Sequence, residues 1–279
     1  MSLEAKRIIY YYQTFTGLSK LLAISPQPTT HIHLASIHFG LEKDGITPYI
    51  HLNDKHPDDP AFDDVWDDCI KAKLQGIEII LMIGGSGGGY STLFSNFNKY
   101  YEMLQTTLKN HPEISGIDLD IEEPTSLENV DMLISQIIKD YPHFIISLAP
   151  VSSSLENDGS PMTGFNYKKL YNKFQNEISY FNGQFYYGDY SLEGFEKCIE
   201  NGYPENKIVM GMVSQPHTLE NNLKVLKEIA RKYPNMGGAF VWELYDADTN
   251  PEIWSVKVER AIYPEDSMIL PYAMFCNIL

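Results

Sequence analysis

Cysteine and positive charge are both scarce in this chain, and each shortage excludes a class of protein. The three cysteines, at positions 69, 198 and 276, lie far apart and form no CxxC pair. Neither a disulfide framework nor a cysteine zinc site is therefore predicted. Lys and Arg number 21 against 37 Asp and Glu, which leaves a net charge of −16. Because this balance repels nucleic-acid backbones, we expect no nucleic-acid partner and favour a neutral or cationic ligand.

Long apolar runs are missing as well. No stretch approaches the length of roughly 20 apolar residues that crosses a bilayer, so no membrane partner is expected. Residues 1–6 lack the apolar core of a signal peptide. A leader that had been removed would leave the same sequence, and we slightly favour an extracellular location over a cytoplasmic one. We also expect a monomer.

Two patterns that can mark cofactor or metal sites are incomplete. The glycine-rich segment 84–89 has no G-x-G-x-x-G register, and Tyr90 follows it where a P-loop requires lysine. His31 and His33 share one face of a predicted strand, but no third ligand accompanies them. Satisfied structural histidines are the better interpretation. We therefore predict neither a cofactor nor a metal.

Eight short runs rich in Ile, Val, Tyr and Phe alternate with segments of helical spacing, which is typical of an α/β fold. The predicted strands cover residues 7–12, 31–39, 77–83, 116–121, 144–149, 180–186, 208–213 and 238–244. The predicted helices cover residues 63–74, 93–108, 126–138, 167–174, 192–199, 219–230 and 251–262. This order favours a single (β/α)8 TIM barrel over residues 1–279, without a large inserted subdomain. The alternative, an open doubly wound sheet, should show a phosphate-binding fingerprint near its first strand, and none is present there.

Two further segments lie outside this alternation. The long connection over residues 40–60 follows the second predicted strand, so we expect it on the C-terminal rim of the barrel. Residues 262–279 are expected to pack across the outside of the barrel, with no assigned function.

A row of acids stands out in the fourth predicted strand. Side chains alternate across a strand, so Asp118, Asp120 and Glu122 should point into the barrel. The intervening residues Ile117, Leu119 and Ile121 should then pack outward against helices. Buried acids persist only when they share protons and hydrogen bonds, and this coupling separates their titrations. We expect Asp120 to keep a proton on Glu122, which would then serve as a general acid. A solvated edge or a calcium loop is the alternative, but the glycine turn and ligand spacing of an EF-hand are missing.

This row resembles the signature of glycoside hydrolase family 18, the chitinases and endo-β-N-acetylglucosaminidases, usually written DGxDxDxE. Here it reads SGIDLDIE over residues 115–122. Segment 81–85 (LMIGG) is similar to the third-strand motif that ends in paired glycines. Segment 184–186 (QFY) is similar to the sixth-strand motif of the plant-type, class III-like branch. Segment 237–243 (GGAFVWE) is similar to the eighth-strand motif with its tryptophan.

The resemblance implies catalytic roles for four residues. Glu122 matches the proton donor, and Asp120 matches the residue that orients the substrate's acetamido group. Asp118 matches a deeper acid that shares a proton with Asp120, and Tyr186 matches the hydroxyl that bonds the acetamido oxygen. Substrate-binding roles follow for a second group: the polar contact Gln184, the aromatic floor Trp242, an aromatic wall at Tyr11, and the backbone at Gly84 and Gly85.

The function that this resemblance implies is retaining, substrate-assisted hydrolysis of β-1,4 bonds in N-acetylglucosamine-containing glycans, by way of an oxazolinium intermediate. Chitin, chitooligosaccharides and the chitobiose core of N-glycans all remain open as substrates. A catalytically weak, glycan-binding lectin-like barrel is the alternative, and a phosphate-binding barrel enzyme is disfavoured for want of a phosphate loop. Two positions depart from the pattern. Ser115 occupies the position of the first Asp, and we expect this position to support the site from below. Tyr187 stands where Asn or Asp is frequent in the family.

Overall fold

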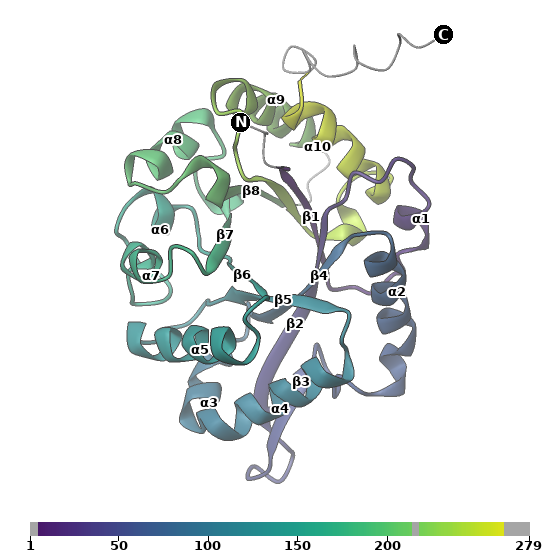
Figure 1. The fold of residues 1–279 in the computed structure, drawn as a ribbon, viewed down its shortest axis with the longest axis vertical. Coiled ribbons are helices and arrows are strands. Elements are labelled where there is room, and N and C mark those ends of the chain that lie inside the picture. Colours follow the sequence, from purple (N-terminus) through teal and green to yellow (C-terminus); the bar gives the residue numbers. More distant parts are fainter. Residues whose placement is uncertain (1–4, 214–217, 265–279) are drawn as a thin grey trace.

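The computed structural model describes residues 5–213 and 218–264, which form a closed barrel of parallel strands (Figure 1). Its eight strands are β1 (Arg7–Tyr12), β2 (His31–Leu41), β4 (Glu78–Gly84), β5 (Ile114–Asp120), β6 (Ile145–Leu148), β7 (Ile178–Gly183), β8 (Ile208–Val213) and β9 (Gly238–Trp242). Each strand pairs in parallel with its neighbour, and β1 closes the ring by pairing with both β2 and β9. The predicted (β/α)8 TIM barrel is confirmed.

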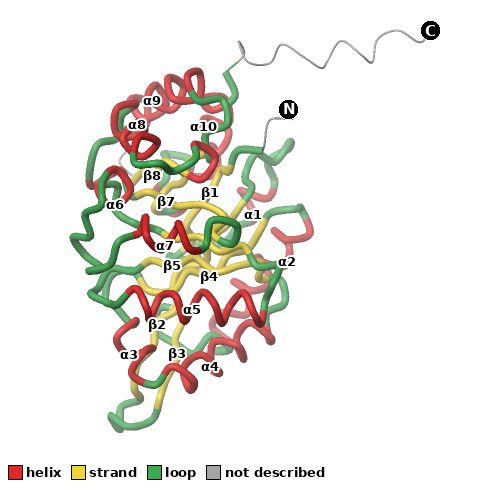
Figure 2. The backbone as a smooth tube through the Cα atoms, turned by 60° about the vertical axis from the view of Figure 1, so that its left-hand side comes forward, coloured by secondary structure: helices red, strands yellow, loops and turns green. Residues whose placement is uncertain are grey.

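Helices surround the strands on the outside of the barrel (Figures 1 and 2). They are α1 (Ser19–Leu22), α2 (Asp63–Leu74), α3 (Tyr90–Ser95), α4 (Phe97–Asn110), α5 (Leu127–Asp140), α6 (Ser153–Glu156), α7 (Tyr167–Lys173), α8 (Leu192–Glu200), α9 (Leu219–Lys232) and α10 (Trp254–Ile262). Polar side chains begin several of them. Ser126, Asn166 and Ser191 each accept a bond from the backbone N–H three residues on, which satisfies a donor that the first helical turn leaves free.

The buried residues form two separate clusters. The larger, which we call the outer core, lies between strands and helices, and a typical member is Trp254 of α10, which is fully buried. The smaller, the interior cluster, fills the barrel itself with Ile9, Tyr11, Ala35, Met82, Tyr180, Val209 and Phe240. Alternation along each strand sends one set of side chains to each cluster.

The connection predicted over residues 40–60 contains an additional strand. β2 continues to Leu41, and β3 (Pro48–Leu52) returns antiparallel beside it. The carboxyl-terminal part of β2 and β3 therefore form a hairpin (Figure 2). The expected place on the rim is therefore correct, but the segment is not a plain loop. The alternation of Tyr49, Ile50, His51 and Leu52 was the signal that could have revealed the strand.

Several predicted boundaries were wrong. The predicted strand 180–186 ends at Gly183, because residues Phe185–Tyr187 form a 3-10 turn. The predicted strand 238–244 ends at Trp242. The predicted helix 93–108 is broken at Asn96, whose φ of −149° and ψ of 65° are not helical. The expectation for residues 262–279 falls mainly outside the described residues. A single-domain organisation over residues 1–279 stays a prediction.

Closure of the barrel requires a glycine at position 238, where β9 pairs with Arg7 of β1. Its φ is +127°, and a Cβ there would lie 2.0 Å from the Arg7 carbonyl oxygen. We expect Gly238→Ala to lower the free energy of unfolding by roughly 3 kcal/mol or more, because strained backbone and a forced clash add together. Urea unfolding measures the change.

Gly40 provides the matched control for this experiment. It also lies in a barrel strand, but its φ is not positive and a Cβ there meets nothing within 4 Å. Gly40→Ala should alter the free energy of unfolding by no more than about 0.5 kcal/mol. Equal unfolding midpoints for the two variants would contradict the closure argument.

Candidate active site

The acids of the signature lie at the carboxyl end of β5. Asp118 and Asp120 are strand residues, and Glu122 follows two positions after the strand has ended. Glu122 therefore lies in the loop after β5, and its carboxylate shares a neighbour, Gln184, with that of Asp120. Asp118 is fully buried, Asp120 is 5% exposed, and Glu122 is partly exposed. The acids thus rise from the barrel interior toward its mouth, where barrel enzymes place their chemistry.

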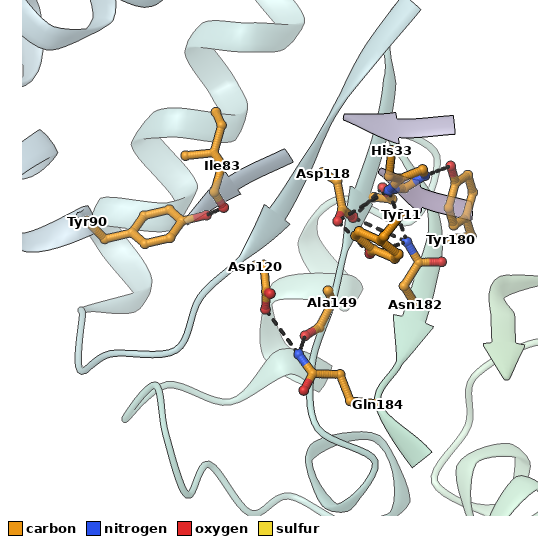
Figure 3. A network of polar contacts seen from close by, with 11 residues as sticks. Tyr11, His33, Ile83, Tyr90, Asp118, Asp120, Ala149, Tyr180, Asn182 and Gln184 are labelled. Carbon is orange, nitrogen blue, oxygen red and sulfur yellow. Dashed lines mark hydrogen bonds and ion pairs between the residues drawn. The ribbon is translucent and has the colours of Figure 1, made fainter. Parts of the chain in front are cut away.

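Asp118 is held by side chains from four other strands (Figure 3). Tyr11 of β1 donates its hydroxyl to Oδ2 at 2.7 Å, and Ser147 of β6 donates to Oδ1 at 2.6 Å. Asn182 of β7 donates to Oδ1 at 3.4 Å, and His33 Nδ1 of β2 lies 3.4 Å from Oδ2. A buried carboxylate is tolerated only with such partners.

These partners determine the charge on Asp118. Burial by itself would raise the pKa of Asp118, but His33 and the hydroxyls of Ser147 and Tyr11 outweigh that effect and hold the pKa below its ordinary value. His33 Nε2 is 3.0 Å from the hydroxyl of Tyr180, so both ring nitrogens of this histidine are engaged. Asp118 is therefore ionised at neutral pH.

Asp120 has the opposite electrostatic environment. Burial raises its pKa well above the ordinary value, and the nearby charges of Glu122 and Asp118 raise it further. A proton is consequently stored on Asp120, between an ionised acid below and Glu122 above. Asp120 is more deeply buried than Glu122, and this burial was not anticipated from the sequence. The expectation that Asp120 keeps a proton on Glu122 stays a prediction.

Gln184 connects the two upper acids. Its Nε2 donates to Asp120 Oδ1 at 3.1 Å and to the Ala149 carbonyl at 2.9 Å, and lies 3.5 Å from Glu122 Oε1 (Figure 3). The side chain is 3% exposed, which fixes its position. Gln184 thus lies among the acids, and its role as a polar contact to the sugar stays a prediction.

Gly84 and Gly85 bring the end of β4 against Asp120. Their φ values are +90° and +86°, and the Gly85 N–H donates to the Asp120 carbonyl at 2.8 Å. A Cβ on Gly84 would lie 2.3 Å from that carbonyl oxygen, and one on Gly85 would lie 3.3 Å from Asp120 Oδ2. Both residues are buried, so close packing around Asp120 requires glycine at these positions.

Aromatic side chains lie close to the acids. Trp242 at the end of β9 and Tyr186 of the 3-10 turn are partly exposed, and both pack on the interior cluster. The rings of Trp242 and Tyr11 are 5.3 Å apart, and those of Tyr186 and Phe240 are 6.2 Å apart. Tyr186 and Trp242 therefore lie at the carboxyl ends of β7 and β9, and their contacts with a sugar stay a prediction.

Tyr11 requires a correction. An aromatic wall residue must expose its ring, but Tyr11 is 2% exposed and its hydroxyl is committed to Asp118. Asn182 Nδ2 donates to the same hydroxyl at 2.9 Å. Tyr11 therefore supports the buried acid and offers no surface to a sugar.

Two other acids close to the motifs have structural tasks. Glu123 Oε1 accepts bonds from the N–H groups of Tyr90 and Ser91, so it caps the start of α3. Glu243 Oε2 accepts from the N–H groups of Gln13 and Thr14 at 2.8 and 3.1 Å. Each carboxylate fastens one rim loop to another, which leaves Glu122 as the acid of the Glu122–Glu123 pair that lies with Asp120 and Gln184.

Sequence reasoning missed most of the support beneath the site. His33 was interpreted only as a structural histidine, and Ser147, Tyr180 and Asn182 were not singled out. Polar residues at inward positions of predicted strands were the available signal. Ser115 was misplaced: its hydroxyl contacts Lys73 Nζ of α2 at 2.5 Å, so it faces outward and does not support the acids from below. The side chain of Tyr187 lies outside the described part of the structure.

A parallel barrel with ionisable groups gathered at the carboxyl ends of its strands defines the chain as a TIM-barrel enzyme. The model of the glycosyl hydrolases family 18 matches residues 7–224. The chain belongs to this family and is a glycosidase acting on glycans that contain N-acetylglucosamine.

Solved structures agree with this assignment. A fungal endo-β-N-acetylglucosaminidase of the family is 29% identical, with a TM-score of 0.81 over 94% of this chain and 100% of that chain. A chitinase from Aspergillus fumigatus is also 29% identical, with a TM-score of 0.78 over 86% of this chain and 92% of that chain. A family 18 chitinase from Pseudoalteromonas aurantia, at 18% identity and a TM-score of 0.71 over 92% and 100%, shares the fold.

The search of curated proteins found no match. The plant-type branch stays a prediction. Within residues 5–213 and 218–264, no helix is long and apolar enough to cross a membrane. In the same part of the chain, no group of three His, Cys, Asp or Glu side chains is arranged to hold a metal ion.

The raised pKa of Asp120 can be tested through the pH dependence of the protein's thermal stability. A raised pKa in the folded state contributes stability at low pH, and this contribution is lost as the pH rises toward the folded-state pKa. Asp120→Asn mimics the protonated acid at every pH. We expect its melting temperature to match that of the wild type near pH 4 and to exceed it increasingly as the pH rises above about 4. Thermal melts between pH 4 and 9 measure the difference, and a gap that narrows with rising pH would refute the assignment.

Proposed function

We propose that the chain is a retaining endo-acting hydrolase that cleaves β-1,4 bonds next to N-acetylglucosamine by substrate-assisted catalysis. Glu122 is the general acid, Asp120 orients the acetamido group, and Tyr186 bonds the acetamido oxygen. The observation that supports this most strongly is the gradient of burial along the row of acids: Asp118 is fully buried, Asp120 is 5% exposed, and Glu122 is partly exposed at the barrel mouth. Gln184 Nε2 contacts both Asp120 and Glu122, so the acids form one unit.

The proposed first step breaks the glycosidic bond. The acetamido oxygen of the substrate attacks its own anomeric carbon, and Glu122 transfers its proton to the departing oxygen. The new ring is a positively charged oxazolinium, which an anionic neighbourhood stabilises. Because the nucleophile belongs to the bound sugar, the reaction becomes intramolecular, and correct orientation can remove several kcal/mol of barrier.

The second step restores the enzyme. Glu122, now a carboxylate, removes a proton from water as the water oxygen attacks the anomeric carbon. The bond from that carbon to the acetamido oxygen breaks, and two inversions give net retention. Trp242 would support the apolar face of the reacting sugar, since it is partly exposed beside the interior cluster. Neither step requires a cofactor.

Both chitin-type oligomers and the N-glycan chitobiose core fit this chemistry. One similar structure is described as an endo-β-N-acetylglucosaminidase and another as a chitinase, at the same 29% identity. These two similar structures leave both substrates open. The lectin-like alternative is disfavoured because Glu122, Asp120 and Gln184 are present together. We retain the prediction that the enzyme acts as a monomer.

The role of Glu122 is tested by Glu122→Gln, with Glu123→Gln as the matched control. The first variant keeps the shape but cannot donate a proton, so cleavage of N-acetylglucosamine hexamer and of a high-mannose glycopeptide should fall by about 10²- to 10⁴-fold. The second changes a helix cap, and its glutamine oxygen can still accept a bond, so its activity should stay within a few fold of wild type. Product release by chromatography gives the rates.

Two further results bear on the mechanism. Proton NMR of the product formed in the first minutes should show the β-anomer, since retention predicts it. An initial α-anomer would exclude the proposed pathway. Equal activity of Glu122→Gln and the wild type would remove Glu122 from the mechanism, and tight binding without cleavage by the wild type would support the lectin alternative.

A further inference from the structure

A pocket opens at the amino-terminal end of the barrel, and we call it the basal pocket. Its volume is about 230 Å³. The strands run from this end toward Glu122, so the basal pocket is not part of the site at the barrel mouth. The residues that line it lie at or near the starts of β1, β2, β6 and β7, and they are Ala5, Lys6, Arg7, Thr30, His31, Ile145, Ser179 and Tyr180.

Arg7 supplies a positive charge to the basal pocket. Alternation along β1 places Arg7 on the same face as Ile9 of the interior cluster. Its guanidinium lies over the ring of Tyr180, with 4.4 Å between the guanidinium carbon and the ring centroid. Nη1 donates to the carbonyls of Asn206 and Gly237 at 3.1 and 3.4 Å. These neutral partners orient the guanidinium without cancelling its charge.

His31 contacts the same tyrosine from β2. The ring centroids of His31 and Tyr180 are 5.6 Å apart, and the rings are inclined by 80°. His31 is 9% exposed, and its Nδ1 is 2.8 Å from Thr30 Oγ1. Within residues 5–213 and 218–264, Nε2 of this histidine has no hydrogen-bond partner. Buried polar atoms are normally satisfied, so an unsatisfied nitrogen on a pocket wall indicates a place for a ligand.

The charges that act on His31 are positive. Burial lowers its pKa well below the ordinary value, and the charges of His33, Arg7 and Lys73 lower it further. Glu78, the cross-strand partner of His31 on β4, forms an ion pair with Lys73. A negative ligand next to His31 would offset the repulsion among these cations and favour a proton on the imidazole.

Tyr180 separates the basal pocket from the buried acids. It is fully buried, and burial raises its pKa far above the ordinary value, so the phenol is neutral. Its hydroxyl is 3.0 Å from His33 Nε2, and His33 Nδ1 is 3.4 Å from Asp118 Oδ2 (Figure 3). The side chains of Tyr180 and His33 therefore lie between Arg7 and the negative charge of Asp118.

We propose that the basal pocket binds a small inorganic oxyanion of the sulfate or phosphate type, between Arg7 and a protonated His31. Guanidinium and imidazolium groups form charge-assisted hydrogen bonds, which are stronger than neutral ones. The volume is below that of pockets for drug-sized molecules, which suits a small ligand. Lys6 also lines the pocket, but its Nζ contacts the Ile262 carbonyl, so we assign it no ligand.

Calorimetric titration of the whole protein with sulfate, and separately with phosphate, tests the pocket at constant ionic strength. The wild type should bind a single anion per chain. Arg7→Gln should weaken binding roughly tenfold or more, because a charge-assisted contact is lost. Lys43→Gln is the control, since it removes one positive charge from an exposed residue of the β2–β3 hairpin, at the other end of the barrel. Its affinity should equal that of the wild type.

His31 gives the binding a pH dependence that a second variant removes. Sulfate keeps its charge between about pH 5.5 and 7.5, so any change in its affinity comes from the protein. Because His31 takes up a proton as the anion binds, the affinity of the wild type should rise severalfold as the pH falls. His31→Gln stays polar but does not titrate, so its affinity should be nearly constant over this range.

Three results would overturn the proposal. One is the absence of binding by the wild type up to about 10 mM sulfate at about pH 5.5, which is the range of a weak site. Another is equal weakening in Arg7→Gln and Lys43→Gln, which indicates attraction to charge in general. The third is a pH dependence in His31→Gln equal to that of the wild type, and this comparison decides the matter if thermal melts show that Arg7→Gln does not fold.

The basal pocket is also distinguished from the proposed function. Glu122→Gln should bind sulfate as tightly as the wild type does, because Glu122 lies at the opposite end of the barrel. Weaker binding in this variant would place the anion at the barrel mouth and reject the basal pocket. Loss of glycan cleavage in Glu122→Gln has no bearing on the anion.

Discussion

The burial of one negative charge, on Asp118, constrains the centre of this barrel. A carboxylate with no solvent contact is costly, and here Tyr11, His33, Ser147 and Asn182 provide its partners. These side chains come from four strands that are distant in sequence, so the charge can be accommodated only when the barrel has closed. The same charge helps to raise the pKa of Asp120. The charge on Asp118 is therefore both the group that is costly to bury and a cause of the raised pKa of Asp120.

The architecture could be predicted from sequence because its signals are local. Eight apolar runs with strand composition correspond to the eight barrel strands, and the acids of SGIDLDIE identified the strand that carries the chemistry. The support of Asp118 could not be predicted in this way, since it depends on register between strands, such as the pairing of Asp118 with Ser147. The raised pKa of Asp120 could not be predicted for a related reason, because it depends on how deeply that side chain is buried, and sequence does not give depth.

The rim and the interior tolerate change differently. The interior cluster packs side chains from several strands into one space, so each side chain limits the others. The β2–β3 hairpin on the rim places Ile37, Phe39, Ile50 and Leu52 in the outer core, while Leu41 near its tip is 52% exposed. Similar structures at 29% identity keep a TM-score near 0.8, which fits a fixed frame with variable edges.

The carboxylates of Glu123 and Glu243 have a consequence for how such barrels diversify. Glu243, after β9, accepts bonds from the backbone at residues 13 and 14, after β1, and Glu123, after β5, caps α3, after β4. Backbone donors of this kind depend on loop length and shape, whatever side chains the loop carries. An inserted or exchanged loop would misplace the donors and leave its partner loop unanchored. Recombination between homologues should therefore succeed when adjacent connections are inherited as pairs, and fail when one is transplanted alone.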